Sequence, residues 1–330
     1  MNGTRLAGVM LIVILLWSGG QAQGETVTLK YGQIPSTIKS VSSLPLYVAE
    51  RRGFFAREEL KVEIRPIQGG AHNMVAALDR GEVDITRTAT PYLILAALKG
   101  SDAVAITGET RTPIYSLVVQ PDIKTYGDLK GKLLGLSLKV DTISISMRKL
   151  FARHGLRLGD YRVKELVGTP PRFECLKRGE CAGVPLGQPE DFRALKEGYR
   201  RLGISTEAVP DFQFTVSATR RGWAEQNKDK VTRYVRAMAS AYRYLRAPAN
   251  REDAVNIIVA TTGSSAEIAR DILTLYFEPD KGVFPKEGEL DLTGMARVLE
   301  FMAEAGEVKS PLPRPQRFVD LQFLRAAGNR

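Results

Sequence analysis

The sequence predicts an α/β fold built as two similar lobes, and three observations support this prediction. Short apolar segments of strand character alternate with helical segments, a pattern typical of βαβ units and mostly parallel sheets. The turn sequence LDRGEV at residues 78–83 returns as LKRGEC at residues 176–181. The chain has 330 residues and is 44% hydrophobic, which is enough to fill one large core or two moderate ones.

The first series of elements spans residues 27–107. Its first segment alternates apolar and polar side chains and runs into a loop rich in Pro and Ser, which indicates a strand leading into a helix. Gly53 ends the first helix, and the pair Gly69-Gly70 opens the second. The predicted strands are 27–32, 62–67, 83–85 and 104–107, and the predicted helices are 44–50, 70–78 and 92–98.

A second series repeats the first. Both copies of the echoed turn follow a helix and contain a glycine, Gly81 or Gly179, because a sharp left-handed turn from helix to strand favours glycine. A chance repeat of a common turn is the alternative, but the order of elements favours duplication. The predicted strands are 133–137, 163–167 and 182–186, and the predicted helices are 143–153 and 173–177.

Residues 216–246 have no counterpart in the repeat. Apolar side chains recur there at helical spacing, while basic side chains lie mostly off that stripe, which predicts a long amphipathic helix with a solvated basic face. The stripe comprises Val231, Tyr234, Val235, Met238, Tyr242 and Leu245. Further helices are predicted at 266–276 and 292–305, followed by a stiff, proline-rich extended segment at 311–315.

The first 22 residues indicate export. Arg5 precedes an apolar run at 6–17 that is too short to span a bilayer, and Gly20 and Ala22 fit the small-residue rule for signal peptidase. We expect a signal peptide cleaved after Ala22, with an uncleaved anchor as the alternative, and a periplasmic mature protein. The formal net charge of +10 suits an acidic partner, and export favours an acidic solute over nucleic acid.

Cysteine and histidine are scarce, with two of each in the chain. Cys175 and Cys181 lie six positions apart, in a compartment where disulfides persist. Either a disulfide or two separately buried thiols fits the sequence, because spacing does not give the distance between the Cα atoms. Two cysteines and two histidines are too few metal-binding side chains for a zinc finger or a His-rich metal enzyme.

No motif for catalysis is present. The chain lacks a G-x-S-x-G elbow, an H-E-x-x-H helix and a Walker loop, and Gly69-Gly70 does not have the spacing of a dinucleotide fingerprint. We therefore expect no catalytic residue, no metal and no cofactor.

Gly, Ser and Thr recur instead where a predicted strand meets a helix. Helix N-termini at that edge of a parallel sheet offer free N–H groups and a positive dipole end, which suit a carboxylate or sulfonate. Helix capping is the alternative for each hydroxyl. The candidate ligand-binding residues are Ser36, Ser42, Ser43, Gly69, Gly70, His72, Arg87, Thr88, Thr90, Arg111, Thr112, Tyr115, Asp141, Thr142, Ser144, Pro185 and Gln188.

Two arginines are candidates to hold an anion. Arg87 lies in a short polar segment that we interpret as a loop after a buried strand, where its guanidinium would face the cleft and bind a carboxylate or sulfonate with two hydrogen bonds. Arg111 precedes Thr112-Pro113 at the expected crossing between the lobes. A solvated surface position is the alternative for both.

Several motifs together resemble the nitrate/sulfonate/taurine family of solute-binding proteins of ABC importers, which also includes binders of thiamine-pyrimidine precursors. These motifs are LPLYVA at 44–49 with GFF at 53–55, AL at 77–78 with GEVDI at 81–85, DLKGK at 128–132 and FVDL at 318–321. The resemblance spans residues 31–324. One departure is Ala182, which stands where the family usually has an acidic residue after the second turn.

The resemblance implies a type II periplasmic binding protein, with mixed, mostly parallel sheets in two lobes joined by two crossing strands and with ligand in the cleft. We expect lobe I at 25–113 plus 218–330 and lobe II at 114–217. The loops at 36–43, 69–72, 86–90, 112–116, 141–144 and 185–188 would line the cleft.

The function expected from the resemblance is capture of a small anionic organic solute, of the sulfonate or carboxylate class, by a monomer that serves an ABC permease in the inner membrane. Two alternatives remain open. One is a periplasmic sensor partner, and the other is a thiamine-pyrimidine-related binding protein or enzyme, although an enzyme of that kind would be cytosolic.

Overall fold

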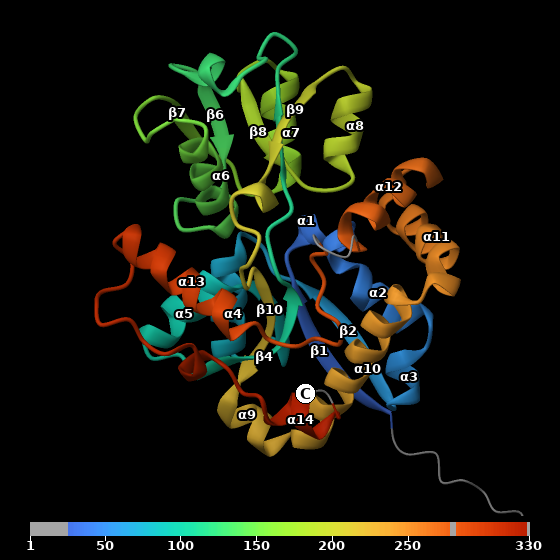
Figure 1. Cartoon of the computed structure of the whole chain (residues 1–330). Coiled ribbons are helices and arrows are strands. Elements are labelled where there is room, and N and C mark those ends of the chain that lie inside the picture. The colour runs from blue at the N-terminus through green and yellow to red at the C-terminus, as the bar shows by residue number, and fades with distance from the viewer. Residues whose placement is uncertain (1–25, 278–281, 329–330) are drawn as a thin grey trace, which may run out of the picture.

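We describe a computed structural model of the chain, which covers residues 26–277 and 282–328. Two lobes, each with its own sheet, are stacked one above the other (Figure 1). The expected signal peptide at residues 1–22 lies outside the described residues. Within the described part of the chain, no helix is long and apolar enough to cross a membrane.

The first lobe is built on a five-stranded sheet in the order β2-β1-β3-β10-β4. Four of its strands run parallel, and β10 is antiparallel to both of its neighbours, β3 and β4. The strands are β1 (Val27–Gln33), β2 (Leu60–Pro66), β3 (Ile85–Ala89), β4 (Ala103–Thr110) and β10 (Thr215–Arg220).

The second lobe repeats this plan with the order β7-β6-β8-β5-β9. Here β5 is the antiparallel strand, between β8 and β9. Both sheets therefore follow one topology and are mixed but mostly parallel, as predicted. The strands are β5 (Ser116–Val119), β6 (Leu133–Leu136), β7 (Arg162–Glu165), β8 (Gly183–Leu186) and β9 (Arg200–Ile204).

Helices cover both sheets (Figure 1). Those of the second lobe are α6 (Thr142–Arg153), α7 (Thr169–Lys177) and α8 (Glu190–Lys196). Those of the first lobe are α1 (Pro35–Ile38), α2 (Leu44–Arg51), α3 (Phe54–Arg57), α4 (Ala71–Asp79), α5 (Thr90–Leu98), α9 (Arg221–Gln226), α10 (Lys228–Arg246), α11 (Arg251–Thr262), α12 (Ala266–Phe277), α13 (Leu292–Glu304) and α14 (Gln322–Ala326).

The echoed turns occupy equivalent places in the two lobes. Gly81 joins α4 to β3 with φ of 71°, and Gly179 joins α7 to β8 with φ of 69°. Both values lie in the left-handed region that side chains disfavour, so the glycine expected from the sequence is required by the backbone. The equivalent turns and the common strand order support duplication over a chance repeat.

The long helix α10 confirms the predicted amphipathic stripe. All six stripe residues are buried, and the helix packs against α2 and α3. Two basic residues beside the stripe form ion pairs with the end of α3, Arg233 with Glu59 at 2.9 Å and Arg236 with Glu58 at 2.9 Å. The basic face of this helix is therefore partly neutralised within the molecule.

The two cysteines form a disulfide that joins the end of α7 to the segment before β8. Of the two interpretations that the sequence left open, the structure contains the bridge. Cys175 and Cys181 are both buried in the small core between α7 and the second sheet.

The chain crosses between the lobes twice, between β4 and β5 and again between β9 and β10. The expected boundary at 217/218 falls within β10, although all six residues of that strand pair with strands of the first lobe. We therefore propose that the second boundary lies at the start of β10, at Thr215.

Candidate functional site

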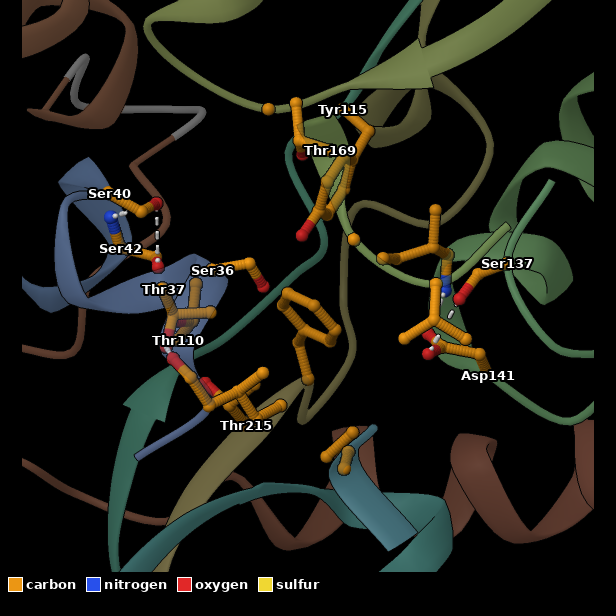
Figure 2. A pocket seen from close by; sticks show the side chains of 18 of the residues that line it. Ser36, Thr37, Ser40, Ser42, Thr110, Tyr115, Ser137, Asp141, Thr169 and Thr215 are labelled. Carbon is orange, nitrogen blue, oxygen red and sulfur yellow. Dashed lines mark hydrogen bonds between the residues drawn. The ribbon is translucent and has the colours of Figure 1, made fainter. Parts of the chain in front are cut away.

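A cavity of about 140 Å³ lies between the lobes. Its first-lobe wall comes from α1 and the turn after it, from the start of α4 and from the ends of β3, β4 and β10. Its second-lobe wall comes from the starts of α6 and α7 and from the segment between β8 and α8. In Figure 2, Ser36 and Thr37 of the first lobe face Ser137 and Asp141 of the second across this space.

Eight of the predicted ligand-binding residues line this cavity, and all eight come from the predicted loops or their immediate ends. They are Ser36, Ser42, Gly70, Arg87, Thr88, Tyr115, Asp141 and Gln188. The structure brings them together, and their contact with a ligand stays a prediction.

The other nine do not line the cavity. Three have hydroxyls that donate to backbone carbonyls elsewhere: Ser43 to Thr37, Thr112 to Val209 and Ser144 to Ser137. Arg111 lies 3.7 Å from Asp291 beside a separate surface groove, and Pro185 is part of β8. The remaining four are Gly69, His72, Thr90 and Thr142.

The predicted loop around Arg87 is wrong. Arg87 is the middle residue of β3, a strand buried along its whole length and paired with β1 and β10. The polar composition of ITRTA suggested a loop, but the hydroxyls of Thr86 and Thr88 donate to backbone carbonyls of a neighbouring strand and of helix α4. Thr86 donates to Gly32 at 3.0 Å, and Thr88 donates to Ala71 at 3.0 Å.

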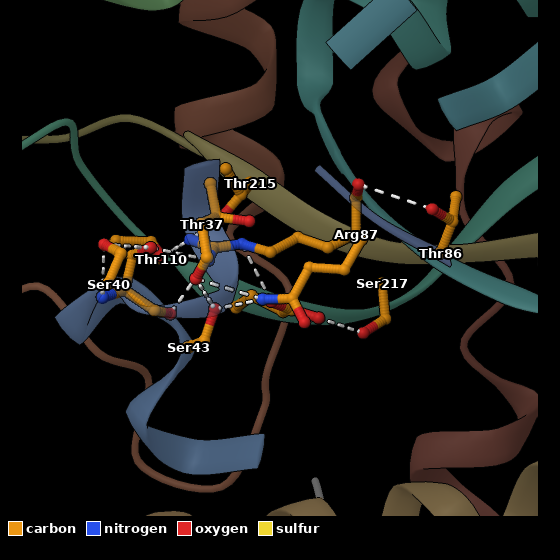
Figure 3. Close-up of polar contacts among 12 residues, drawn as sticks. Thr37, Ser40, Ser43, Thr86, Arg87, Thr110, Thr215 and Ser217 are labelled. Carbon is orange, nitrogen blue, oxygen red and sulfur yellow. Dashed lines mark hydrogen bonds and ion pairs between the residues drawn. The ribbon is translucent and has the colours of Figure 1, made fainter. Parts of the chain in front are cut away.

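The Arg87 guanidinium is already occupied by protein groups. Its Nε lies 3.0 Å from Oε2 of Glu109, and Nη1 donates to the carbonyl and hydroxyl of Ser42 at 2.9 Å each. Nη2 donates to Thr110 at 3.1 Å and Thr215 at 3.2 Å (Figure 3). Its charge is matched by Glu109, and its hydrogen bonds to Ser42 hold the turn after α1 in place at the cavity wall. We call this structural role of Arg87 its strut role.

Glu109, which the sequence did not single out, is the centre of this buried network. Its carboxylate also accepts hydrogen bonds from Tyr31, at 2.8 Å, and from Ser217. Burial, with the nearby Glu109 charge, raises the pKa of the Tyr31 hydroxyl well above its ordinary value, so Tyr31 stays neutral and donates.

Arg172 is a second buried arginine at the cavity, and sequence reasoning missed it. Only 1% of it is exposed. Its Nε donates to the carbonyl of Pro185 at 2.7 Å, Nη1 to that of Leu166 at 3.2 Å and Nη2 to the hydroxyl of Thr169 at 3.3 Å. No carboxylate of the described residues forms an ion pair with it.

The position of Arg172 could have singled it out had the predicted helix begun at residue 169, where α7 starts, and not at residue 173. It lies in the first turn of α7, where the helix dipole disfavours a cation. A basic residue in the first turn does not stabilise the helix, so its presence there points to a role outside the helix. Burial lowers the pKa of the Arg172 guanidinium, and the neighbouring Tyr115 and Asp141 oppose this effect.

Asp141 supplies the opposite charge at the same cavity. It caps α6, with Oδ1 accepting from the backbone N–H of Ile143 at 2.9 Å and Oδ2 accepting from the Ser137 hydroxyl at 3.0 Å. Burial raises the pKa of the Asp141 carboxyl, against the opposing effects of these hydrogen bonds and of Arg172.

Apolar and aromatic side chains complete the wall. Tyr115 lies over the guanidinium of Arg172, with 5.7 Å between the ring centre and the guanidinium carbon, and packs edge to face on Phe214 at 6.1 Å. Ile34, Ile143 and Val167 add aliphatic surface. The cavity therefore combines charged groups at its wall with a largely apolar lining.

Contacts across the cleft hold the lobes together around the cavity. Tyr276 of α12 donates to the Gln188 amide oxygen at 3.0 Å, and Arg193 of α8 donates to the carbonyl of Thr262 at 2.8 Å. Two ion pairs also bridge the lobes, Lys196 to Glu267 at 2.7 Å and Lys149 to Glu304. The structure is thus a closed arrangement of the two lobes.

The geometry of two similar lobes around a closed cavity agrees with a comparison against protein families. The NMT1/THI5-like family model matches residues 40–251, which is most of the chain. The chain belongs to the NMT1/THI5-like family. The match covers most of the first lobe's cavity-lining turns and all of the second lobe.

The proteins that this chain resembles have low sequence identity to it, and those with solved structures share its fold. The Bacillus subtilis protein named "Putative binding protein YtlA" is 21% identical over 309 residues, covering 89% of this chain and 88% of that protein. The periplasmic aliphatic sulphonate-binding protein SsuA of Escherichia coli is 19% identical, with a TM-score of 0.69 over 89% of this chain and 92% of SsuA.

Two further solved structures share the fold. One is the periplasmic nitrate-binding protein NrtA of Synechocystis PCC 6803, with 14% identity and a TM-score of 0.74 over 92% of this chain and 89% of NrtA. The other is the ligand-binding component of an ABC-type import system from Staphylococcus aureus, with 14% identity and a TM-score of 0.75 over 91% of this chain and 98% of that protein. These structures establish the periplasmic-binding-protein fold, the fold class that the sequence predicted.

Proposed function

We propose that this protein is the exported solute-binding component of an ABC importer. It captures a small anionic organic solute, of the sulfonate or carboxylate class, between its lobes and presents the closed complex to an ABC permease in the inner membrane. It works in the periplasm as a monomer, after removal of its signal peptide, and performs no catalytic step. The family and the fold of its structural neighbours support this proposal.

The observation that carries the anionic class is Arg172. A buried cation without a carboxylate partner is costly, because neutral carbonyl and hydroxyl groups replace only part of its hydration. Three of the five N–H groups of its guanidinium are used by the protein, which leaves two for a ligand. An anion in the cavity would supply the missing charge.

The contacts across the cleft support capture by closure. Gln188 lines the cavity from the second lobe, and its hydrogen bond to Tyr276 brings α12 of the first lobe to the same wall. A solute that contacts both lobes stabilises this closed arrangement over an open one by its difference in affinity for the two.

The test is a binding screen of the mature chain, residues 23–330, by thermal shift and calorimetry. The panel holds alkane and aryl sulfonates, aliphatic and aromatic carboxylates, nitrate and neutral pyrimidines. At a concentration of 100 times its Kd, a bound sulfonate or carboxylate should raise the free energy of unfolding by about 2.7 kcal/mol.

The variant Arg172→Gln should weaken that binding by at least about tenfold, since it removes a charge-assisted contact in an enclosed site. Arg172→Lys keeps the charge and guards against loss of folding. Arg178→Gln, on the exposed end of the same helix, is the matched control. Tight binding of neutral pyrimidines alone, or full sulfonate affinity in Arg172→Gln, contradicts the proposal.

A further inference from the structure

Four exposed cations surround an exposed leucine on the second lobe, outside the cavity. Lys130 and Lys132 come just before β6, Arg157 precedes Leu158 in the turn after α6, and Arg162 begins β7. The side chain of Leu158 is 77% exposed. We call these five residues the basic end, and we propose that the basic end binds the anionic phospholipid surface of a membrane.

Backbone hydrogen bonds hold the basic end together. The N–H of Gly131 donates to the carbonyl of Asp160 at 2.7 Å, and the N–H of Arg162 donates to the carbonyl of Lys132 at 2.8 Å. The segment before β6 and the turn before β7 therefore lie side by side, and their cations share one surface although they are distant in the sequence.

The basic end lies at the opposite end of the strands from the cavity. Ser137, directly after β6, and Val167, shortly after β7, both line the cavity. Because β6 and β7 are parallel, their starts lie together at the other end of the sheet. In Figure 1, β6 and β7 lie above α6, on the side of the second lobe away from the first. A partner at the basic end therefore does not block the cavity.

The four cations of the basic end are unmatched by the protein. None of them forms an ion pair with a carboxylate of the described residues, whereas other exposed cations of the same lobe are paired. Lys164 and Arg178 both lie 2.7 Å from the carboxylate of Glu180. The basic end is therefore free to attract anions from outside the molecule.

The carboxylates beside the basic end accept hydrogen bonds from the backbone. Oδ2 of Asp160 accepts from the N–H of Arg157 at 2.8 Å. Oδ2 of Asp128 accepts from the N–H groups of Lys124 and Thr125 at 2.9 Å each. Lys124 is itself exposed and offsets the charge of Asp128, so this surface stays positive.

Leu158 favours a lipid surface over an acidic protein. Val163 on β7 is 42% exposed and lines the same open groove as Leu158, so the aliphatic surface extends beyond one side chain. A protein partner needs an apolar pocket that matches these side chains, whereas the headgroup region of a bilayer accepts an aliphatic side chain at any point. Lipid phosphates also move laterally, so they can follow long cationic side chains that no described carboxylate holds in place.

The number of cations is sufficient for reversible binding. Each Lys or Arg close to an anionic bilayer strengthens binding by about fivefold, so four together contribute roughly 600-fold. Binding of this kind keeps an exported protein near a membrane without anchoring it. The inference goes beyond solute capture and does not depend on which solute the cavity holds.

The experiment is co-sedimentation of the mature chain, residues 23–330, with lipid vesicles. The protein should bind vesicles of equimolar phosphatidylcholine and phosphatidylglycerol and should not bind phosphatidylcholine alone. Raising the salt concentration from about 0.1 M to about 1 M should release it, because the Debye length falls from about 10 Å to about 3 Å.

Two quadruple variants locate the binding surface. The basic-end variant should bind the mixed vesicles at least about a hundredfold more weakly. Its substitutions are Lys130→Gln, Lys132→Gln, Arg157→Gln and Arg162→Gln. The control removes the same charge from exposed positions of the first lobe and should keep most of the binding. Its substitutions are Lys61→Gln, Lys99→Gln, Lys309→Gln and Arg314→Gln.

A single variant tests the aliphatic contact. Leu158→Ser should weaken binding to the mixed vesicles by about threefold or more, because the leucine is no longer withdrawn from water, and should leave the salt dependence unchanged. Thermal unfolding checks that each variant is folded. The basic-end variant should also bind solute as tightly as the unaltered protein, since its substitutions lie away from the cavity.

The outcomes separate this inference from the proposed function. Equal weakening by the two quadruple variants, or no binding of the unaltered protein to the mixed vesicles, overturns the membrane surface and leaves solute capture standing. Full vesicle binding by Leu158→Ser, together with tight binding of soluble polyglutamate, assigns the basic end to an acidic polypeptide and also overturns it. Vesicle binding that only the basic-end variant and Leu158→Ser weaken supports the inference, whatever the solute screen finds.

Discussion

At the scale of single residues, the two buried arginines at the cavity differ in what surrounds them. Arg87 lines the cavity and its contact with a ligand stays a prediction, but its charge is matched by Glu109 and its guanidinium donates to Ser42, Thr110 and Thr215. Arg172 was not singled out, and it reaches the cavity with no carboxylate partner among the described residues. The difference lies in their partners, since both side chains are buried.

The role of Arg87 as a strut leads to a stability prediction. Arg87→Met should lower the free energy of unfolding by about 3 kcal/mol or more, because it leaves the Glu109 carboxylate buried without its cation. Urea unfolding measures this loss. Arg80→Met, which removes an exposed arginine paired with Glu82, should leave the unfolding midpoint unchanged. An equal effect of the two variants would mean that Arg87 has no strut role.

At the scale of elements, helix α7 connects the disulfide to the site. Its first turn carries Thr169 and Arg172, and its end carries Cys175, which is bonded to Cys181 before β8. The bridge closes a loop of seven residues. A change in the packing of this helix would therefore shift the Arg172 guanidinium at the cavity wall.

Removal of the bridge should destabilise the protein modestly. In the chain-entropy account, a loop of this size contributes about 2.4 kcal/mol to the free energy of unfolding. The double variant Cys175→Ala, Cys181→Ala should lose roughly this amount in urea unfolding without reductant. The unaltered protein in dithiothreitol should behave in the same way, and a reductant-insensitive midpoint would contradict the bridge.

At the scale of the whole molecule, an apolar cluster that includes Tyr92 and Ile143 and a small set of polar contacts join the two lobes. Away from the crossing segments, the bridging polar contacts include two ion pairs with exposed side chains and two hydrogen bonds, Tyr276 to Gln188 and Arg193 to Thr262. Exposed ion pairs contribute little to stability, because water screens them and holding their long side chains costs entropy. We therefore expect closure to depend on a solute in the cavity, which would add contacts to both lobes.

Small-angle X-ray scattering tests this dependence. With a saturating solute, the radius of gyration should be near the value for a compact chain of this length, roughly 20 Å. Without solute it should be larger, because the lobes separate by bending at the two crossing segments. An identical scattering curve in both conditions would show that capture does not proceed by closure.

Patterns among residues close together in the sequence were sufficient to predict most of the fold. The alternation of strands and helices, the αL glycines at 81 and 179 and the buried stripe of α10 depend on residues a few positions apart, so they can be read along the chain. The same reasoning misplaced β3, because the polar segment ITRTA is a central strand whose hydroxyls are satisfied by neighbours distant in sequence.

The charge pattern of the site was decided by tertiary structure alone. The turns that line the cavity follow from topology, because the ends of parallel strands meet at one edge of a sheet. Whether an arginine is matched depends on partners from other elements, such as Glu109 on β4 for Arg87 on β3. Burial and pairing are properties of the packed molecule, and they distinguish Arg172 as a buried cation at the cavity without an ion-pair partner among the described residues.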